Sequence, residues 1–144
     1  MTFAKSFVLK KMEEIVGYLG EAEDLFKFSD KEILADSGKM HIAERLLQLI
    51  VDEIIDINQH FIKELDLKIS EDFQGAFYVL GENKILPTDF AGKIAPVVGL
   101  RNRVVHRYET LNTCLFISIF RKNFEDFKEY LKIINDYCTV NTMG

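Results

Sequence analysis

Apolar residues recur every three or four positions along most of the chain, and no segment shows sustained alternation of apolar and polar residues. This spacing predicts amphipathic helices. The first 28 residues carry one such series, made of Val8, Met12, Ile15, Leu19, Ala22 and Phe26. The sequence SDKE then has the form of a capping box, in which Ser29 accepts a hydrogen bond from the amide of Glu32 while Glu32 reaches back. It predicts that a short helical turn or a new helix begins there.

Residues 37–65 show the strongest helical pattern, with apolar positions that form two stripes. One stripe contains Ile42, Leu46, Leu49 and Ile57, and the other contains Leu47, Ile50, Ile54 and Phe61. A helix with so wide an apolar face contacts more than one neighbour. We therefore predict a long helix in this segment, and we take the width of its apolar face as one indication of a dimer.

A shorter helix is predicted over residues 70–83. Ser70 opens it, and Glu71 and Asp72 place negative charge in its first turn, where the helix dipole favours that charge. The sequence GENK, followed by Pro87, breaks this helix.

Two more helices are predicted in the second half of the chain. The fourth begins at Pro87 or Thr88 and runs toward residue 105, and Pro96 is expected to kink or interrupt it because proline lacks a backbone donor. The fifth covers about residues 111–138. Its apolar face consists of Leu115, Ile119, Phe124, Phe127, Leu131 and Ile134.

Composition agrees with one domain over residues 1–144. The 144 residues, 48% of them hydrophobic, suffice for one core and are too few for two. We therefore predict an all-α fold, a single-domain antiparallel bundle of about five helices with short connections. No run of 18 uncharged apolar residues occurs, so we expect a soluble, cytoplasmic protein without a membrane segment. Cys114 and Cys138 stand too far apart in one predicted helix for a disulfide, which fits a reducing compartment.

Charge is distributed unevenly along the chain. The formal net charge of −5 argues against a protein that coats nucleic acid through its overall field. The segment GLRNRVVHRY, residues 99–108, nevertheless carries three arginines and no acidic residue, so it is +3 and the remainder is −8. Any anion site is therefore expected to be a focused one.

Several familiar motifs of nucleotide binding, hydrolysis and metal binding are absent from the sequence. His41 and His60 stand apart from any second histidine or cysteine, so we predict neither a metal nor a cofactor. Asp52 and Asp56 share a helix face beside Glu53, and this spacing can hold a divalent cation. The alternative, which we favour, is a solvated polar stripe between two apolar ones.

The segment RNRVVHRY supplies the groups that RNA cleavage needs. Internal attack by a ribose hydroxyl on the phosphodiester requires an acid or base that is active near neutral pH, a cation on the phosphorane charge and donors that orient the phosphate. His106, Arg101 and Asn102 can fill these roles without a metal. The alternative is a basic helix C-terminus, in which the cationic side chains, Arg103 and Arg107 included, interact with the negative end of the helix dipole.

One geometric difficulty separates Arg101 from His106. Asn102 precedes His106 by four residues and would share its helix face. Arg101 precedes His106 by five residues, which on an ideal helix rotates it about 140° away. Bringing Arg101 and His106 together therefore requires the helix to end or distort near Val105, or a second subunit to complete the site.

The string R-N-x-x-x-H-x-Y, formed by Arg101, Asn102, His106 and Tyr108, resembles the motif of the HEPN superfamily, and specifically that of the HepT-type toxins of bacterial and archaeal toxin–antitoxin modules. The sequence AERLLQLIVDEIIDI and the order of the predicted helices extend the resemblance over nearly the whole chain. The resemblance implies a HEPN-like bundle and a metal-independent endoribonuclease that works as a homodimer. The two motifs would face each other across a shared cleft.

The resemblance also implies a role for each motif residue. Arg101 would stabilise phosphate charge, Asn102 would orient the phosphate, and His106 would act as general acid or base. Arg103 and Arg107 are candidates for auxiliary contacts to RNA phosphates.

Tyr108 has a different implied role. HepT-type toxins are neutralised by a cognate minimal nucleotidyltransferase antitoxin that adenylylates the tyrosine of this motif, and a bulky anion there would obstruct the cleft. The expected partners are thus a second copy of the chain, this antitoxin and an RNA substrate, either tRNA or mRNA. Two alternatives use the same segment: a non-catalytic HEPN module that binds nucleotide or RNA, and a structural partner of the nucleotidyltransferase.

Overall fold

The computed structural model describes residues 3–106 and 112–141, and every regular element within these ranges is an α-helix. The predicted all-α fold is therefore confirmed. In chain order the helices are α1 (Lys5–Leu25), α2 (Asp30–Leu34), α3 (Ser37–Glu64), α4 (Phe73–Glu82), α5 (Thr88–Ile94), α6 (Val97–His106) and α7 (Thr113–Asn141). Arg107 and Tyr108, two of the predicted site residues, lie outside the described residues.

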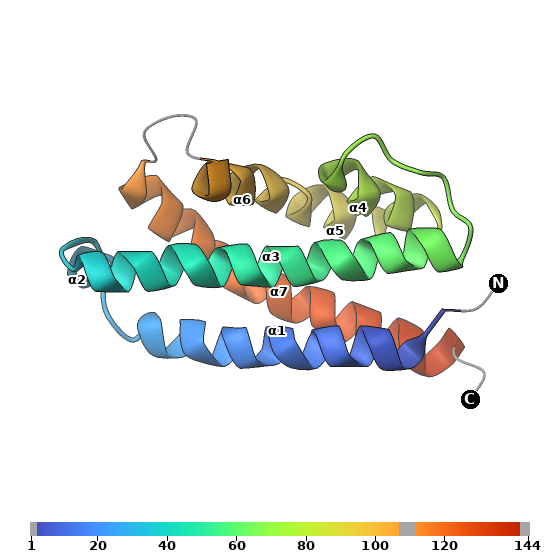
Figure 1. Ribbon diagram of the computed structural model, residues 1–144, viewed down its shortest axis with the longest axis horizontal. Helices are drawn as coiled ribbons and strands as arrows, with labels where there is room; N and C mark the ends of the chain where they lie inside the picture. The colour runs from blue at the N-terminus through green and yellow to red at the C-terminus, as the bar shows by residue number, and fades with distance from the viewer. Residues whose placement is uncertain (1–2, 107–111, 142–144) are drawn as a thin grey trace.

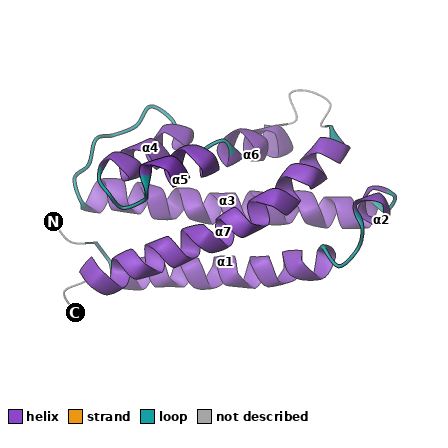
Figure 2. Ribbon diagram, turned by 180° about the vertical axis from the view of Figure 1, so that it is seen from behind, coloured by secondary structure: helices purple, strands orange, loops and turns teal. Residues whose placement is uncertain are grey.

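Helix α3 occupies the middle of the bundle. Figures 1 and 2 show α1 along one side of α3 and the series α4, α5 and α6 along the other, while α7 crosses behind α3 in Figure 1 and in front of it in Figure 2. The chain direction in α1 and α6 is opposite to that in α3 and α7, as in an antiparallel bundle (Figure 1). The wide apolar face predicted for residues 37–65 is explained by this position, because α3 packs against α1, α4 and α6.

The core confirms one predicted stripe of α3 more fully than the other. Leu47, Ile50, Ile54 and Phe61 are all completely buried. In the second stripe Leu46 and Ile57 are buried, whereas Ile42 is 50% exposed. Asn58 is also buried, and its side-chain oxygen accepts a hydrogen bond of 2.6 Å from the hydroxyl of Tyr130 in α7. This bond satisfies two buried polar atoms and joins the central helix to the last one.

Helix α2 begins with the predicted capping box. The Oγ atom of Ser29 accepts from the amide of Glu32 at 3.1 Å, and the Glu32 carboxylate accepts from the amide of Ser29 at 3.0 Å. Arg121 of α7 stabilises the connection between α1 and α2, since it donates to the Asp30 carboxylate and to the backbone oxygens of Phe26 and Phe28. The short helix is thereby tied to α7.

Helix α4 begins later than the sequence indicated. Its N-cap is Asp72, whose carboxylate accepts from the amide of Gly75 at 2.6 Å. Ser70, the predicted start, instead donates from its hydroxyl to the backbone oxygen of Asp72 at 2.7 Å. The prediction was wrong here because serine and aspartate are both good caps, and the sequence does not show which of them meets the free amides.

Pro96 interrupts the fourth predicted helix, as expected. Helix α5 ends at Ile94 and α6 begins at Val97, so this division and the short α2 account for seven described helices where about five were predicted. The last helix agrees with its predicted span and contains both cysteines, of which Cys114 is exposed and Cys138 is buried, each a free thiol. Leu115 departs from the predicted apolar face, because it is 50% exposed.

Candidate functional site

Helix α6 presents the motif on the faces that its apolar residues leave uncovered. Val97, Val98, Leu100 and Val104 are buried and fix α6 against the bundle. The motif side chains of Arg101 and Asn102 are partly buried, and those of Arg103 and His106 are exposed. The helix therefore has one face in the core and the cationic motif at the border between core and solvent.

Arg101 is held by an acidic residue of the central helix. Its Nε atom donates to the Asp52 carboxylate of α3 at 2.8 Å, and its Nη1 atom donates to Oδ1 of Asn102 at 3.0 Å. The side chains of Arg101 and Asp52 are only 19% and 33% exposed. A charge-assisted hydrogen bond in such a setting fixes the guanidinium strongly. These bonds use two of the five N–H donors of arginine, so the group retains donors for an anion.

His106 is the last residue of α6 and follows Asn102 by one helical turn. The helix is regular through Val105, and its last described residue is His106, one position later. Arg101 and His106 of one chain consequently remain on different faces of α6.

The basic residues near the end of α6 are also consistent with a stabilised helix terminus. Arg103 and His106 both lie in the last turn, where positive charge interacts favourably with the helix dipole. This interaction explains their position on the surface. It does not explain Arg101, which points instead toward the Asp52 carboxylate.

The three carboxylates considered for a divalent cation are engaged by basic side chains. Asp52 binds Arg101, whereas Glu53 and Asp56 lie 3.5 Å and 2.9 Å from the Nζ atom of Lys11 in α1. The predicted solvated stripe agrees with the exposed Asp56 and the partly exposed Asp52, whereas the side chain of Glu53 is only 13% exposed. Within residues 3–106 and 112–141, no group of three histidine, cysteine or acidic side chains is arranged to hold a metal ion.

Glu53 has the most unusual ionisation among these residues. Burial, together with the facing carboxyl of Glu14, raises the pKa of Glu53 to about 7, although the charge of Lys11 opposes this shift. The hydrogen bond between the two carboxyl groups lowers the pKa of Glu14. A proton on Glu53 can therefore be donated to Glu14 near neutral pH.

His41 and His60 have separate environments. His41 is exposed on α3, while the Nε2 atom of His60 accepts from the backbone amide of Ala4 at 3.0 Å. The His60 ring also stacks on Phe7 with a centroid distance of 4.6 Å. Burial lowers the pKa of His60, which favours the neutral ring that this contact requires.

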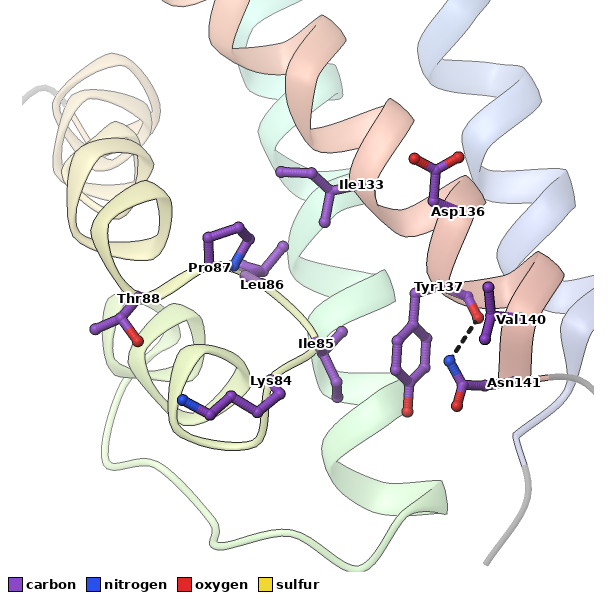
Figure 3. Close-up of a pocket in the computed structure, with 10 residues that line it drawn as sticks. All are labelled: Lys84, Ile85, Leu86, Pro87, Thr88, Ile133, Asp136, Tyr137, Val140 and Asn141. Atoms are coloured by element: carbon purple, nitrogen blue, oxygen red, sulfur yellow. Dashed lines mark hydrogen bonds between the residues drawn. The ribbon is translucent and has the colours of Figure 1, made fainter.

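Two of the cavities among the described residues lie in different parts of the bundle. One of about 300 Å³ is lined by Asn102 of the motif, by Val98 and by residues 71–74 at the beginning of α4. The other, of about 420 Å³, lies between the α4–α5 connection and the last turns of α7, and Figure 3 shows Tyr137 and Lys84 on its walls. Of the described motif residues, Arg101, Asn102 and His106, none lines this second cavity, whereas Asn102 lines the first.

No helix in the described part of the chain is long and apolar enough to span a bilayer.

The sequence is similar to those of known nucleases. The chain is 33% identical over 138 residues to the tRNA nuclease HepT of Aphanizomenon flos-aquae, an alignment that covers 95% of this chain and 94% of the relative. It is 25% identical over 126 residues to the mRNA nuclease HepT of Shewanella oneidensis, with 88% and 86% covered. Both alignments extend over most of each protein.

A solved structure has the same fold. A tri-AMPylated HEPN toxin of Shewanella oneidensis in complex with MNT antitoxin superposes with a TM-score of 0.85 at 21% identity, covering 92% of this chain and 99% of the toxin. The model of the family described as ribonuclease HepT-like matches residues 15–134. The motif, the helical order and these similarities agree, and the chain belongs to the ribonuclease HepT-like family of HEPN proteins.

Proposed function

We propose that this protein is an endoribonuclease toxin of a toxin–antitoxin module and that it acts on cytoplasmic RNA. Two relatives with alignments over most of the chain are named as HepT nucleases of tRNA and of mRNA. The observation that carries the proposal is the fixed guanidinium of Arg101, which lies beside Asn102 one helical turn before the exposed His106. Together these side chains offer a cation, an orienting amide and a proton-transfer group.

The proposed reaction is internal cleavage of the RNA backbone. The ribose 2′ hydroxyl attacks the adjacent phosphorus, a proton leaves the hydroxyl, and the 5′ oxygen departs as a second proton reaches it. His106 transfers one of these protons. Arg101 stabilises the negative charge that develops on the phosphorane oxygens, and Asn102 orients the phosphate. Arg103, which is exposed, and Arg107 are proposed as further phosphate contacts.

The proposed site is shared by two subunits. Arg101 and His106 of one chain lie on different faces of the regular helix α6, so they do not converge on one phosphate. In a symmetric dimer, Arg101 of one protomer can instead face His106 of its partner across a common cleft. This arrangement would create two equivalent sites in each dimer.

The proposed partner is a nucleotidyltransferase antitoxin that adenylylates Tyr108. The support is the similar HEPN toxin that is tri-AMPylated and bound to MNT antitoxin. An added phosphate would bring negative charge to a site where Arg101 is to receive RNA phosphate. Coexpression with a cognate nucleotidyltransferase antitoxin, followed by intact mass and peptide mapping, should find AMP on Tyr108. Modification confined to other residues would contradict this proposal.

Cleavage assays on purified RNA test the nuclease directly. Wild-type protein should cleave a tRNA or mRNA substrate, and His106→Ala should abolish cleavage while the thermal transition of the protein is unchanged. Full activity in His106→Ala would remove the proposed mechanism. Binding of RNA without cleavage by the wild type would instead favour a non-catalytic HEPN module.

A further inference from the structure

The cavity beside Asn102 joins the motif helix to a second element of the fold. Its lining consists of Val98 and Asn102 from α6, and of Glu71, Asp72, Phe73 and Gln74 at the start of α4. Its volume of about 300 Å³ lies at the lower end of the range for small-ligand pockets. The α4 side contributes an aromatic ring, an amide and carboxylates, none of which has a part in the proposed cleavage chemistry.

The turn that leads into α4 is held in one conformation. The hydroxyl of Ser70 donates to the backbone oxygen of Asp72 at 2.7 Å, and the Asp72 carboxylate accepts from the amide of Gly75 at 2.6 Å. A Cβ atom at Gly75 would lie only 3.0 Å from Oδ1 of Asp72. Because this turn is fixed, it presents the ring of Phe73 at the surface, where 46% of the residue is exposed.

These groups match a nucleobase better than they match a phosphate. An exposed phenylalanine ring offers a face on which a base can stack. Phosphate would be repelled by the Glu71 and Asp72 carboxylates, which only accept hydrogen bonds. A base edge with neighbouring N–H donors has the complementary pattern, because a carboxylate can accept from two donors at once.

We propose that this cavity binds a guanine base of the RNA substrate. Guanine is the RNA base whose Watson–Crick edge carries two adjacent donors, N1–H and the 2-amino group. Glu71 accepts from both, Phe73 stacks on the ring, and the amide of Gln74 donates to the 6-oxygen. Phe73 and Glu71 thereby act as specificity residues for the nuclease.

Asn102 connects the base cavity with the proposed cleavage site. It lines the cavity, and its Oδ1 atom accepts from Nη1 of Arg101 at 3.0 Å. A nucleotide with its base in the cavity would therefore direct its phosphate toward the guanidinium of Arg101. This inference rests on the proposed ribonuclease function, and it predicts cleavage next to guanosine.

Binding to uncleaved RNA tests the cavity separately from catalysis. The probes are two short single-stranded RNAs that differ by one guanosine-to-adenosine change, titrated against His106→Ala protein. The guanosine RNA should bind about tenfold more tightly, as expected for a bidentate base contact. Glu71→Gln in the same background should remove this preference, and Phe73→Ala should weaken binding of both RNAs about tenfold or more.

Glu82→Gln is the matched control, because Glu82 is an exposed acid at the far end of α4 and does not line the cavity. It should leave the preference for guanosine unchanged. Equal binding of the two RNAs by the His106→Ala protein, or equal effects of Glu71→Gln and Glu82→Gln, would overturn the inference.

Cleavage mapping with the wild-type protein separates the two proposals. Cleavage next to guanosine that becomes unselective in Glu71→Gln supports both the nuclease and the cavity. Cleavage that ignores guanosine in the wild type overturns the cavity and leaves the nuclease. Guanosine-selective binding by a protein that cleaves no RNA supports the cavity and rejects the nuclease.

Discussion

Neighbouring carboxylates of α3 have different partners and different consequences. Asp52 points toward α6 and binds Arg101 at 2.8 Å, whereas Glu53 lies 3.5 Å from Lys11 of α1. Consecutive residues of a helix are rotated by about 100°, so two adjacent acids can face different neighbours. The first contact fixes a residue of the proposed active site, and the second joins two helices of the bundle. Residue type alone does not distinguish these roles.

Arg101→Ala should have the largest effect of the variants considered, and the effect should be on RNA cleavage. Loss of the guanidinium should lower kcat/KM for RNA cleavage by about 10²–10³, the usual cost of removing one charge-stabilising donor from a transition state. Stability should change by no more than about 1 kcal/mol, because Asp52 is left with access to water. Single-turnover cleavage and thermal unfolding measure the two effects. A large loss of stability with normal activity in the folded fraction would reverse the assignment.

Asp52→Asn should have the next largest effect. Asp52 acts as a positioning residue, since it holds the Arg101 guanidinium and does not reach the RNA in the proposed mechanism. We expect a decrease in kcat of about tenfold or more with a smaller change in KM, because misplacement of a reacting group lowers the rate. Asp52→Glu, which keeps the charge, should recover part of the activity. Equal losses of stability and activity in both variants would indicate a purely structural role.

Lys11→Met tests the second contact, which joins α1 to α3. It removes the cation that faces Glu53 and Asp56, and burial of Glu53 makes this loss more costly than that of an exposed pair. Denaturant unfolding should show a decrease of about 1 kcal/mol in stability. RNA cleavage per folded molecule should stay at the wild-type value, and a selective loss of cleavage would contradict the separation of the two contacts.

The smallest predicted effect concerns pH. The folded-state pKa of Glu53 is raised from 4.5 to about 7, so its contribution to stability is fully present below pH 4.5 and is lost as the pH rises through about 7. The Tm of Glu53→Gln minus the Tm of the wild type should therefore increase as the pH rises from 5 to 8, by no more than a few degrees.

The surrounding charges do not change this sign. The pKa of Glu14 is lowered and that of Lys11 is raised, so both groups stay charged between pH 5 and pH 8. The control is Glu13→Gln, which removes an exposed carboxylate next to Glu14 on α1. A Tm difference between Glu53→Gln and the wild type that is constant with pH would show that Glu53 does not titrate in this range.

Local chemistry explains which parts of the fold the sequence predicted. The period of the apolar residues locates the long helices, the SDKE sequence forms the expected capping box, and Pro96 interrupts a helix because of its own covalent structure. The start of α4 was misplaced because Ser70 and Asp72 compete for one role, and only the fold decides which side chain meets the amide of Gly75.

The candidate site was predictable in its residue types and less so in its contacts. The motif string and its spacing indicated Arg101, Asn102 and His106. Asp52 was considered only beside its sequence neighbours, because its partner Arg101 lies 49 residues away and the pair forms only when α3 packs on α6. Similarly, the apolar face of α7 was predicted from its period, but that period does not show that Leu115 is exposed.

The central claim is that Arg101 of one protomer acts with His106 of its partner. An equimolar mixture of Arg101→Ala and His106→Ala proteins, exchanged into dimers and verified by dual-tag purification, tests it most directly. Each mixed dimer should contain one intact site out of two, so random exchange should restore about a quarter of the wild-type cleavage rate. A mixture that contains mixed dimers and stays as inactive as either variant alone would contradict the shared site.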